Sequence, residues 1–247
     1  MKIKNIKNYI DYLLQWIKQQ VVSARKVGVV IGISGGIDSA CCLALCKQIK
    51  KIKIYPYHFY FQQNKDELKY IYDLEKTFKI KIEKINLSKS FQAIQRELFI
   101  TDQLSLRNLK IRLHSICLYA IAQNENSLVL GTSNADEIYI GYFTKFGDII
   151  SDLSPLASIN KKQIYEISKI LNVPLSIIKR APTAGFYKGQ TDEKELKLKY
   201  DEIDNYLAGI KINQKSKSKI QHLHNQTSHK RIFINKPLSY ENWCLKK

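Results

Sequence analysis

The feature that most constrains the fold of this chain is the stretch over residues 27–49, which reads VGVVIGISGGIDSACCLALCKQI. Residues 27–33 form an uninterrupted apolar run rich in β-branched side chains, which is typical of a strand buried on both faces of a parallel sheet. Residues 39–49 predict a helix, and a short turn with two adjacent glycines joins the two segments. The stretch therefore predicts a strand–loop–helix unit of an α/β protein.

The rest of the chain continues this alternation of strands and helices. Further strands are expected over 53–61, 81–87 and 127–132, and further helices over 65–78, from Ser88 onward and over 105–125. Pro56 disturbs the first of these strand patterns because proline cannot donate to a sheet. The alternation predicts a doubly wound, mainly parallel sheet flanked by helices, and a hydrophobic content of 45% is enough for one core.

We expect one domain over residues 1–247, with an N-terminal helix over 1–26 and a C-terminal helical segment and tail over 209–247. The low-complexity run KINQKSKSKIQ, residues 211–221, predicts a surface helix or a mobile segment. No internal repeat is visible.

The turn after the first strand has the composition of a phosphate cradle. Gly35 and Gly36 let the backbone approach a ligand closely, Ser34 and Ser39 supply hydroxyl groups, and the next helix adds the partial positive charge of its N-terminus. The turn matches neither the Walker pattern nor G-x-G-x-x-G. The alternative interpretation is a capped tight turn in which Asp38 only starts the helix.

Asp38 is unexpected in a loop that would bind an anion, because its carboxylate repels phosphate unless a cation lies between them. Magnesium takes one or two carboxylates together with phosphate oxygens, so Asp38 predicts a magnesium–nucleotide site. Ligands of doubly wound sheets bind at the carboxyl ends of the strands, where the segment GTSNADE, residues 131–137, also lies. Glu137 is therefore the expected second acid, although it could instead be a solvated acid in a first helical turn.

The formal net charge of +18 leaves three interpretations open. Only six of the 40 Lys and Arg residues are arginine, and the lysines are spread along the whole chain. This pattern fits an AT-rich genome with solvated lysine faces, a nucleic-acid surface, or attraction of a polyanionic small substrate.

The cysteines and the hydropathy pattern indicate the compartment. Five cysteines, at positions 41, 42, 46, 117 and 244, form no C-x-x-C pair, and three of them share one apolar helix, as buried structural thiols do. We therefore expect a reducing compartment, the cytoplasm. No run of about 18 apolar residues predicts a membrane span, and the N-terminus lacks the apolar core of a signal peptide.

Several stretches together resemble a known family. The loop GISGGIDSA is similar to the pyrophosphate-binding loop of the N-type ATP pyrophosphatases, whose fold is adenine nucleotide alpha hydrolase-like. Four further stretches are similar to ammonia-dependent NAD+ synthetases: residues 131–148 (GTSNADEIYIGYFTKFGD), 152–168, 179–204 and 229–231 (HKR). The resemblance runs in order from the N-terminal helix to about Arg231.

The resemblance implies a carbon–nitrogen ligase of NAD biosynthesis. In such an enzyme the nicotinate carboxylate of deamido-NAD+ attacks the α-phosphate of ATP, pyrophosphate leaves, and ammonia converts the adenylated intermediate to NAD+ and AMP. The implied cofactor is Mg2+ with ATP as co-substrate, and the implied partners are deamido-NAD+, ATP, ammonia and a second copy of the chain, with no nucleic acid and no membrane. No covalent enzyme nucleophile is required.

The resemblance also implies roles for matching residues. The metal ligands are Asp38 and Glu137. The ATP-binding residues are Gly32, Ile33, Ser34, Gly35, Gly36, Ile37, Asp38, Ser39, Thr132, Lys161 and Thr183. The deamido-NAD+-binding residues are Arg112, Lys145, Asp152, His229 and Lys230. Taken singly, the arginine could form a structural ion pair, and the lysines and the histidine could be solvated.

The chain departs from the family pattern at three places. Ser133 replaces the glycine or aspartate that is common there, Ile149 and Ile150 replace two glycines, and His114 stands where an arginine is common. The substrate loop is therefore expected to be stiffer or differently shaped, and His114 receives no role.

Two rival functions use the same loop. A basic RNA-binding or tRNA-modifying protein is favoured by the charge, but neither an aromatic RNP-like strand nor a Cys/His cluster is visible. A non-enzymatic nucleotide sensor is the other rival, and pyrophosphate release separates it from a ligase.

Two further expectations concern assembly and the nitrogen source. The apolar residues around Arg112 on the long helix, Ile111, Ile116 and Leu118, exceed what one side of a surface helix needs, which predicts a two-fold dimer. No cysteine has the flanking residues of a glutaminase nucleophile, so we expect free ammonia as the nitrogen donor.

Overall fold

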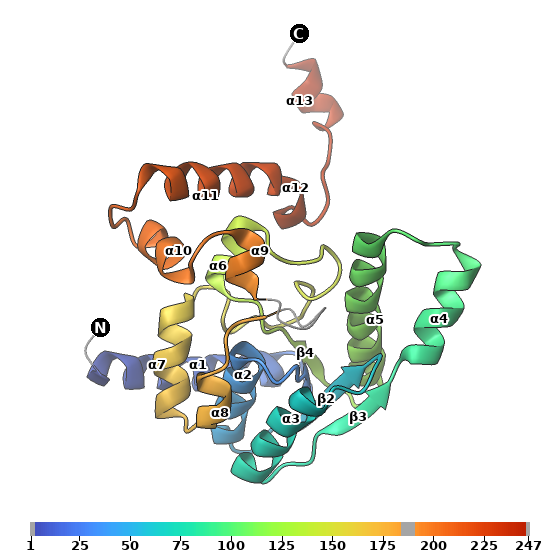
Figure 1. Ribbon diagram of the computed structural model, residues 1–247, viewed down its shortest axis with the longest axis vertical. Coiled ribbons are helices and arrows are strands. Elements are labelled where there is room, and N and C mark those ends of the chain that lie inside the picture. Colours follow the sequence, from blue (N-terminus) through green and yellow to red (C-terminus); the bar gives the residue numbers. More distant parts are fainter. Residues whose placement is uncertain (1–2, 184–190, 246–247) are drawn as a thin grey trace.

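The computed structural model describes residues 3–183 and 191–245 and contains a four-stranded parallel sheet in the order β3-β2-β1-β4 (Figure 1). The strands are β1 (Gly28–Gly32), β2 (Lys53–Tyr60), β3 (Glu83–Asn86) and β4 (Leu128–Leu130). An isolated parallel bridge between Leu130 and Leu153 extends the sheet beyond β4. The predicted doubly wound α/β fold is confirmed.

The described residues form thirteen helices in addition to the sheet. They are α1 (Ile3–Ser23), α2 (Ile37–Gln48), α3 (Lys65–Phe78), α4 (Ser88–Glu97), α5 (Gln103–Asn124), α6 (Ala135–Ile140), α7 (Lys161–Ile170), α8 (Leu175–Ile178), α9 (Asp192–Leu196), α10 (Tyr200–Leu207), α11 (Gln214–Gln226), α12 (Ser228–Arg231) and α13 (Tyr240–Cys244). None of these helices is both long and apolar enough to cross a membrane.

The alternation of side chains along β1 explains why helices cover both faces of the sheet. Val29 and Ile31 face the main core, which α1, α2 and α7 complete. Val30 points to the opposite face and packs with Ala122 of α5 and with Val129. Because both faces are covered, the strand is apolar throughout, as its sequence predicts.

Pro56 fits β2 because β3 covers only the second half of that strand. β2 pairs with β1 from Lys53 to Tyr57, and its pairing with β3 begins at Tyr57. The backbone N–H of Lys53 donates to Val27 on the β1 side, so alternate residues such as Pro56 face the β3 side, before that pairing starts. The missing proline N–H therefore costs no ladder hydrogen bond.

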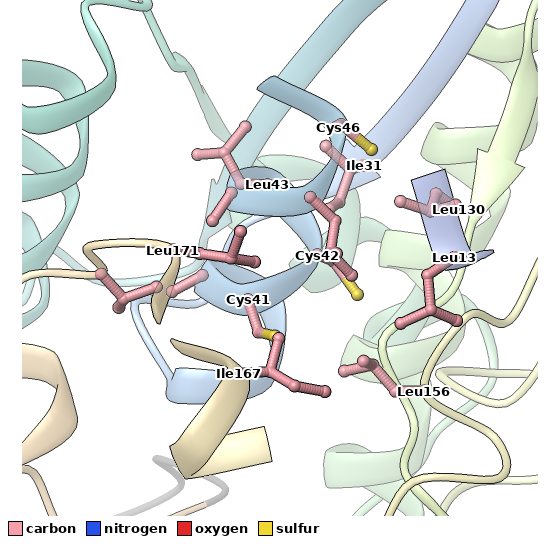
Figure 2. Close-up of a cluster of buried hydrophobic side chains, with 14 of the residues drawn as sticks. Leu13, Ile31, Cys41, Cys42, Leu43, Cys46, Leu130, Leu156, Ile167 and Leu171 are labelled. Carbon is pink, nitrogen blue, oxygen red and sulfur yellow. The ribbon is translucent and has the colours of Figure 1, made fainter. Parts of the chain in front are cut away.

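The three cysteines of α2 are part of the core (Figure 2). Cys41, Cys42 and Cys46 have no exposed surface, and burial raises the pKa of each thiol above its usual value. Thiols held in their protonated form are poor nucleophiles and poor metal ligands. The prediction of structural core cysteines is confirmed.

The C-terminal third builds a second, smaller apolar cluster. Ile140 of α6 packs with residues of α9, α10 and α11, including Ile203 and Ile220. The low-complexity run is largely helical, because Gln214–Gln226 forms α11. Figure 1 shows α11 and α12 above α6, and α13 extending away from the rest of the chain. This arrangement brings residues near position 230 back over the segment that follows β4.

Candidate active site

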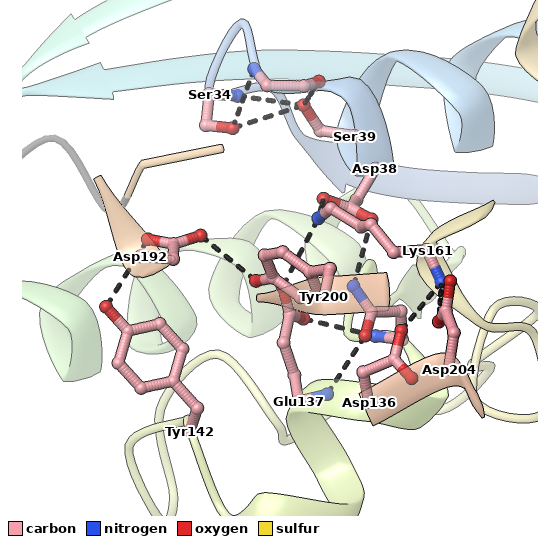
Figure 3. Close-up of polar contacts among 12 residues, drawn as sticks. Ser34, Asp38, Ser39, Asp136, Glu137, Tyr142, Lys161, Asp192, Tyr200 and Asp204 are labelled. Atoms are coloured by element: carbon pink, nitrogen blue, oxygen red, sulfur yellow. Dashed lines mark hydrogen bonds and ion pairs between the residues drawn. The ribbon is translucent and has the colours of Figure 1, made fainter. Parts of the chain in front are cut away.

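The turn between β1 and α2 forms a closed hydrogen-bonded loop, drawn in Figure 3. The Ser34 N–H donates to Ser39 Oγ at 3.2 Å, the Gly36 N–H donates to Ser34 Oγ at 3.2 Å, and Ser39 Oγ donates to the Gly36 carbonyl at 3.1 Å. Gly35 has φ +73°, a left-handed conformation that favours glycine, and a Cβ there would lie 3.1 Å from Cβ of Tyr70. Both serines and both glycines of the motif are thus used to shape the loop.

Arg180 holds this loop from a position 145 residues after Gly35, and sequence reasoning gave it no role. Its Nη1 donates to the Gly35 carbonyl at 3.0 Å, and its guanidinium lies 4.6 Å from the ring centre of Tyr70. The only signal in the sequence was its place next to the APTAG segment of the resembling stretch. The arginine therefore couples the phosphate loop to the segment that carries Thr183.

The centre of the site is a buried cluster of charges that joins three elements (Figure 3). Lys161 Nζ, at the start of α7, lies 2.7 Å from Asp38 Oδ2 in the first turn of α2. The same ammonium lies 3.6 Å from Glu137 Oε1 in the first turn of α6. The Lys161 side chain is 3% exposed, against 19% and 17% for the two acids. The predicted pair of acids thus converges on one point, which a cationic side chain occupies.

Asn134 fixes the relative position of the two acids. Its Nδ2 donates to Asp38 Oδ1 at 3.1 Å, and its Oδ1 accepts the Glu137 N–H at 3.0 Å. The Asn134 N–H donates back to Glu137 Oε2 at 3.2 Å, which completes a capping box at the start of α6. One asparagine therefore caps a helix and links the carboxyl ends of β1 and β4.

The protonation behaviour of this cluster follows from its burial. Burial alone would lower the pKa of Lys161, but the carboxylates of Asp38 and Glu137 outweigh it and hold the pKa above its usual value. Burial raises the pKa of Glu137, and the Lys161 ammonium opposes that rise. The lysine is therefore charged, while the pKa of Glu137 stays raised, at about 8.

A second carboxyl pair anchors the start of α7, and sequence reasoning did not identify it. The Lys161 N–H donates to Asp136 Oδ2 at 2.6 Å and to Asp204 Oδ1 at 3.2 Å, and the Lys162 N–H donates to Asp204 Oδ2 at 3.1 Å. Burial and the neighbouring Asp204 raise the pKa of Asp136. Asp136 lies in the quoted GTSNADE segment, but only the folded chain brings Asp204 to it.

Tyrosines line the same region. The Lys161 ammonium lies 4.8 Å from the ring centre of Tyr200, whose hydroxyl donates to Asp192 Oδ2 at 3.1 Å. The Tyr142 hydroxyl donates to Asp192 Oδ1 at 3.3 Å. These residues were not predicted, since aromatic residues in a sequence with 15 tyrosines give no local signal.

The two threonines predicted to contact ATP lie at the margins of this cluster. Thr132 is half-buried directly after β4, next to Ser133 and the capping Asn134. Thr183 follows Pro182, whose carbonyl accepts the Asp192 N–H at 3.0 Å. Residues 184–190 of the same stretch lie outside the described residues.

Four of the five residues predicted to bind deamido-NAD+ form a second, connected group. Arg112 Nε on α5 donates to the Lys145 carbonyl at 3.2 Å. Lys145 Nζ donates to the carbonyls of His229 and Ile232, at 2.6 and 2.8 Å. Lys230 Nζ donates to the carbonyls of Gly141 and Phe143, at 2.9 and 2.8 Å. Residues from α5, from the loop after α6 and from α12 are thus brought together.

Asp152, the fifth residue, supports the sheet instead of touching this group. Its Oδ2 accepts the Val129 N–H at 2.8 Å, and its Oδ1 accepts from the Tyr119 hydroxyl at 3.4 Å. His114 stacks against Phe59 and Phe61 and points its unpartnered Nε2 into the protein. Burial, His58 and Lys110 lower the pKa of His114 to about 4, so its ring is neutral. The family arginine position is therefore filled here by an uncharged aromatic ring.

The donor set of Asp38 and Glu137 fits a magnesium ion. Magnesium is bound through one or two carboxylates, with phosphate oxygens and water completing its shell. The two acids already converge on one cation, the Lys161 ammonium, next to the phosphate loop. Within the described part of the chain, no group of three or more His, Cys, Asp and Glu side chains offers another metal site.

Comparison with known proteins agrees with this arrangement. The sequence model of the NAD synthase family matches residues 9–235. The NH(3)-dependent NAD(+) synthetase of Mesoplasma florum is 42% identical over 230 residues, which cover 92% of this chain and 94% of the relative. That of Malacoplasma penetrans is 42% identical over 222 residues, which cover 90% of this chain and 91% of the relative.

Solved structures give the same result. An NMN synthetase from Francisella tularensis superposes with a TM-score of 0.87 and 34% identity, covering 94% of this chain and 98% of that one. An NH3-dependent NAD synthetase from Campylobacter jejuni superposes with a TM-score of 0.79 and 27% identity, covering 97% of this chain and all of that one. With its fold, its phosphate loop and the matched range in agreement, this chain belongs to the NAD synthase family.

Proposed function

We propose that this chain is a carbon–nitrogen ligase that amidates deamido-NAD+ with ammonia and ATP, giving NAD+, AMP and pyrophosphate through an adenylated intermediate. The observation that carries the proposal is the meeting of Asp38, Lys161 and Glu137 beside the phosphate loop, with Lys161 Nζ 2.7 Å from Asp38 and 3.6 Å from Glu137. In-line displacement at phosphorus needs positioned phosphates and a neutralised leaving group. The phosphate loop, the lysine and two acids that could hold a metal ion would provide both.

The chain's own residues would divide the work as follows. The N-terminus of α2 and backbone amides of residues 34–39, apart from the Ser34 and Gly36 N–H groups that bond within the loop, would bind the pyrophosphate portion of ATP. Lys161 would contact a phosphate, and Thr132 and Thr183 would make further ATP contacts. Arg180 would keep the loop in shape through its bond to the Gly35 carbonyl. No step needs a covalent nucleophile.

Asp38 and Glu137 would hold Mg2+, which when bound would neutralise charge on the phosphates of ATP. Both acids lie in first turns of helices, Asp38 in α2 and Glu137 in α6, and the capping box of α6 fixes Glu137. Asn134 would keep their separation constant, since it bonds to both.

The second group of cations would bind the dinucleotide. Arg112, Lys145, His229 and Lys230 form one connected set, and the carbonyls that hold Lys145 and Lys230 do not cancel the unit charges of these lysines. The carboxyl group of Asp148 offsets part of the charge of Lys230. Such a region attracts the phosphates and the nicotinate carboxylate of deamido-NAD+. Asp152 is retained as a proposed contact of the same substrate.

We also propose that the enzyme is a homodimer with each chain acting as one domain. On α5, Leu104 and Ile116 are 64% and 65% exposed, whereas Leu118 packs against the sheet. Light scattering should give about twice the 28.7 kDa mass of one chain, and a mass near 28.7 kDa at micromolar concentration would contradict the dimer. The buried, unpaired thiols of α2 support work in a reducing cytoplasm.

Nicotinate mononucleotide is a second candidate substrate. The likeness to the NMN synthetase of Francisella tularensis favours it, because that protein is 34% identical over 94% of this chain. Both candidates carry the nicotinate carboxylate and a phosphate, and they differ in the adenylate half. The same cations could therefore bind either one.

The test is an assay of the purified chain with Mg2+, ATP and ammonium chloride. Deamido-NAD+ should give NAD+ and AMP in equal amounts, with kcat/KM well above that for nicotinate mononucleotide. A higher kcat/KM for the mononucleotide would transfer the proposal to the second candidate. Ammonia-free glutamine should give no product, and equal product from glutamine with glutamate in step would overturn the ammonia assignment.

A further inference from the structure

The place between Asp38 and Glu137 is taken by a side chain of the protein itself. Lys161 Nζ lies 2.7 Å from Asp38 Oδ2 and 3.6 Å from Glu137 Oε1, and the lysine side chain is 3% exposed. Figure 3 shows the ammonium pointing at Asp38 from the start of α7. A metal ion that bridged both carboxylates would need the space that the ammonium fills, and it would be attracted by the same two negative charges.

The position of this ammonium is set by the fold. The Lys161 backbone N–H is bound by Asp136 and Asp204, at 2.6 and 3.2 Å, and Asn160 caps α7. Among the described residues, the only groups that contact Nζ are the two acids and the ring of Tyr200 at 4.8 Å. No backbone carbonyl of the described residues competes for the ammonium, so the carboxylates are its partners in this structure.

The charges make the Lys161 ammonium and a divalent metal ion compete for the place between the two acids. Two carboxylates and one ammonium leave a net charge of −1, which attracts a divalent ion less than the bare pair does. The triphosphate of ATP offers the lysine another anion, and the departure of the ammonium restores both carboxylates as ligands.

We propose that Lys161 blocks the metal site of the free enzyme, so that the divalent ion binds firmly only together with ATP. The inference rests on the proposed function, because it takes Asp38 and Glu137 as the metal ligands. Lys161 would then have two roles: it contacts ATP, and in the free enzyme it is an internal cation that competes with the metal. Binding of ATP and of metal is then coupled through one side chain.

The experiment measures binding of Mn2+, a paramagnetic substitute for Mg2+, to the full chain without nucleotide. Free Mn2+ is counted by electron paramagnetic resonance at pH 8.5, and circular dichroism verifies folding. The variants are Lys161→Met, and Lys161→Gln as a second uncharged side chain that can still donate to Asp38. Lys162→Met is the matched control, since its side chain is exposed on the same helical turn.

Wild type and Lys162→Met should bind Mn2+ weakly. Lys161→Met and Lys161→Gln should bind one Mn2+ about tenfold or more tightly, because a unit charge at contact distance changes the attraction of a dication by more than a decade. Adding Asp38→Asn to Lys161→Met should abolish the gain. Equal Mn2+ affinity in folded Lys161 variants and wild type would overturn the proposal.

Two outcomes separate failure of this proposal from failure of the metal site. If wild type binds Mn2+–ATP in a way that Asp38→Asn removes, but the Lys161 variants bind free Mn2+ no more tightly, the metal site stands and the block is wrong. If the gain in Lys161→Met survives Asp38→Asn, the metal binds elsewhere and both proposals fail.

Discussion

Lys161 and the pair Lys145 and Lys230 are both hydrogen-bonded, but to opposite kinds of partner. Lys161 contacts two carboxylates and has almost no exposed surface. Lys145 and Lys230 donate to backbone carbonyls, two each, lie over the rings of Phe146 and Phe143, and are half-buried. A carbonyl satisfies a donor but does not cancel its unit charge, whereas a carboxylate does.

This difference indicates how one chain could bind two anionic substrates, ATP and a dinucleotide, in different ways. The carbonyl-bound lysines keep their positive field, so the region around them can attract a dinucleotide at a distance. The carboxylate-bound lysine has no field to offer until it changes partner. On the proposed assignment, the ATP region would be switched by its ligand, whereas the dinucleotide region would be charged before its ligand binds.

The largest effect should come from Asp38→Asn. The variant keeps the shape of the side chain but removes one metal ligand and the main partner of Lys161, so kcat/KM should fall by roughly three orders of magnitude or more. Asp66→Asn is a matched control, since Asp66 is also a first-turn acid but is exposed on α3. Near-normal NAD+ formation by a folded Asp38→Asn protein would remove this residue from the metal site.

Lys230→Met tests the proposed dinucleotide region. It removes one positive charge, so KM for deamido-NAD+ should rise about ten- to a hundredfold while kcat for bound substrate changes much less. KM for ATP should stay close to the wild-type value, and Lys215→Met on the exposed face of α11 should change neither. An equal rise in KM for deamido-NAD+ and in KM for ATP would mean that Lys230 supports the whole fold.

His114→Phe tests whether the charge of the dinucleotide region comes from the lysines alone. Burial, His58 and Lys110 lower the pKa of His114 from its usual value of 6.5 to about 4, so the unfolded chain binds more protons between these pH values. The free energy of unfolding should therefore fall as pH drops from 6.5 to 4, by about 3 kcal/mol at most from this group.

His114→Phe should lack this part of the pH dependence while keeping the ring stack on Phe59 and Phe61. Urea unfolding at pH 7.5 and at pH 5 measures it, and activity at pH 7.5 should be unchanged. A steep rise in KM for deamido-NAD+ in this variant would instead assign the histidine to substrate binding.

Added salt should produce the smallest effect. Raising KCl from about 50 to 500 mM screens uncompensated surface charge, so KM for deamido-NAD+ should rise a few-fold. KM for Mg–ATP should rise less, since the buried charges of its site are screened less. An equal dependence for the two substrates would remove the contrast between the regions.

Local sequence predicted the fold and the two acids because each depends on local patterns. The apolar run 27–33, the glycine turn and the first-turn acids Asp38 and Glu137 are signals within a few residues, and the sheet brings strand ends together automatically. The cation between the acids could not be predicted in this way. Lys161 carries no local mark that separates it from the other lysines, and its burial depends on Asp136 and Asp204, which lie 68 positions apart.

The same limit applies to Arg180 and Asp152. Arg180 reaches Gly35 across 145 positions, a contact that no spacing rule indicates. Asp152 matches a substrate contact by resemblance, yet its carboxylate accepts the N–H of Val129 in β4. Its substrate role remains a prediction, while its hydrogen bond to β4 is a property of the fold.

Exchange of labelled pyrophosphate into ATP tests the central claim most directly, because it reports adenylate formation without the ammonia step. With Mg2+ and deamido-NAD+ but no ammonium, wild type should exchange label, and omission of the dinucleotide or Asp38→Asn should abolish exchange. Exchange that proceeds without deamido-NAD+, or a wild type that forms NAD+ but never exchanges, would contradict the account.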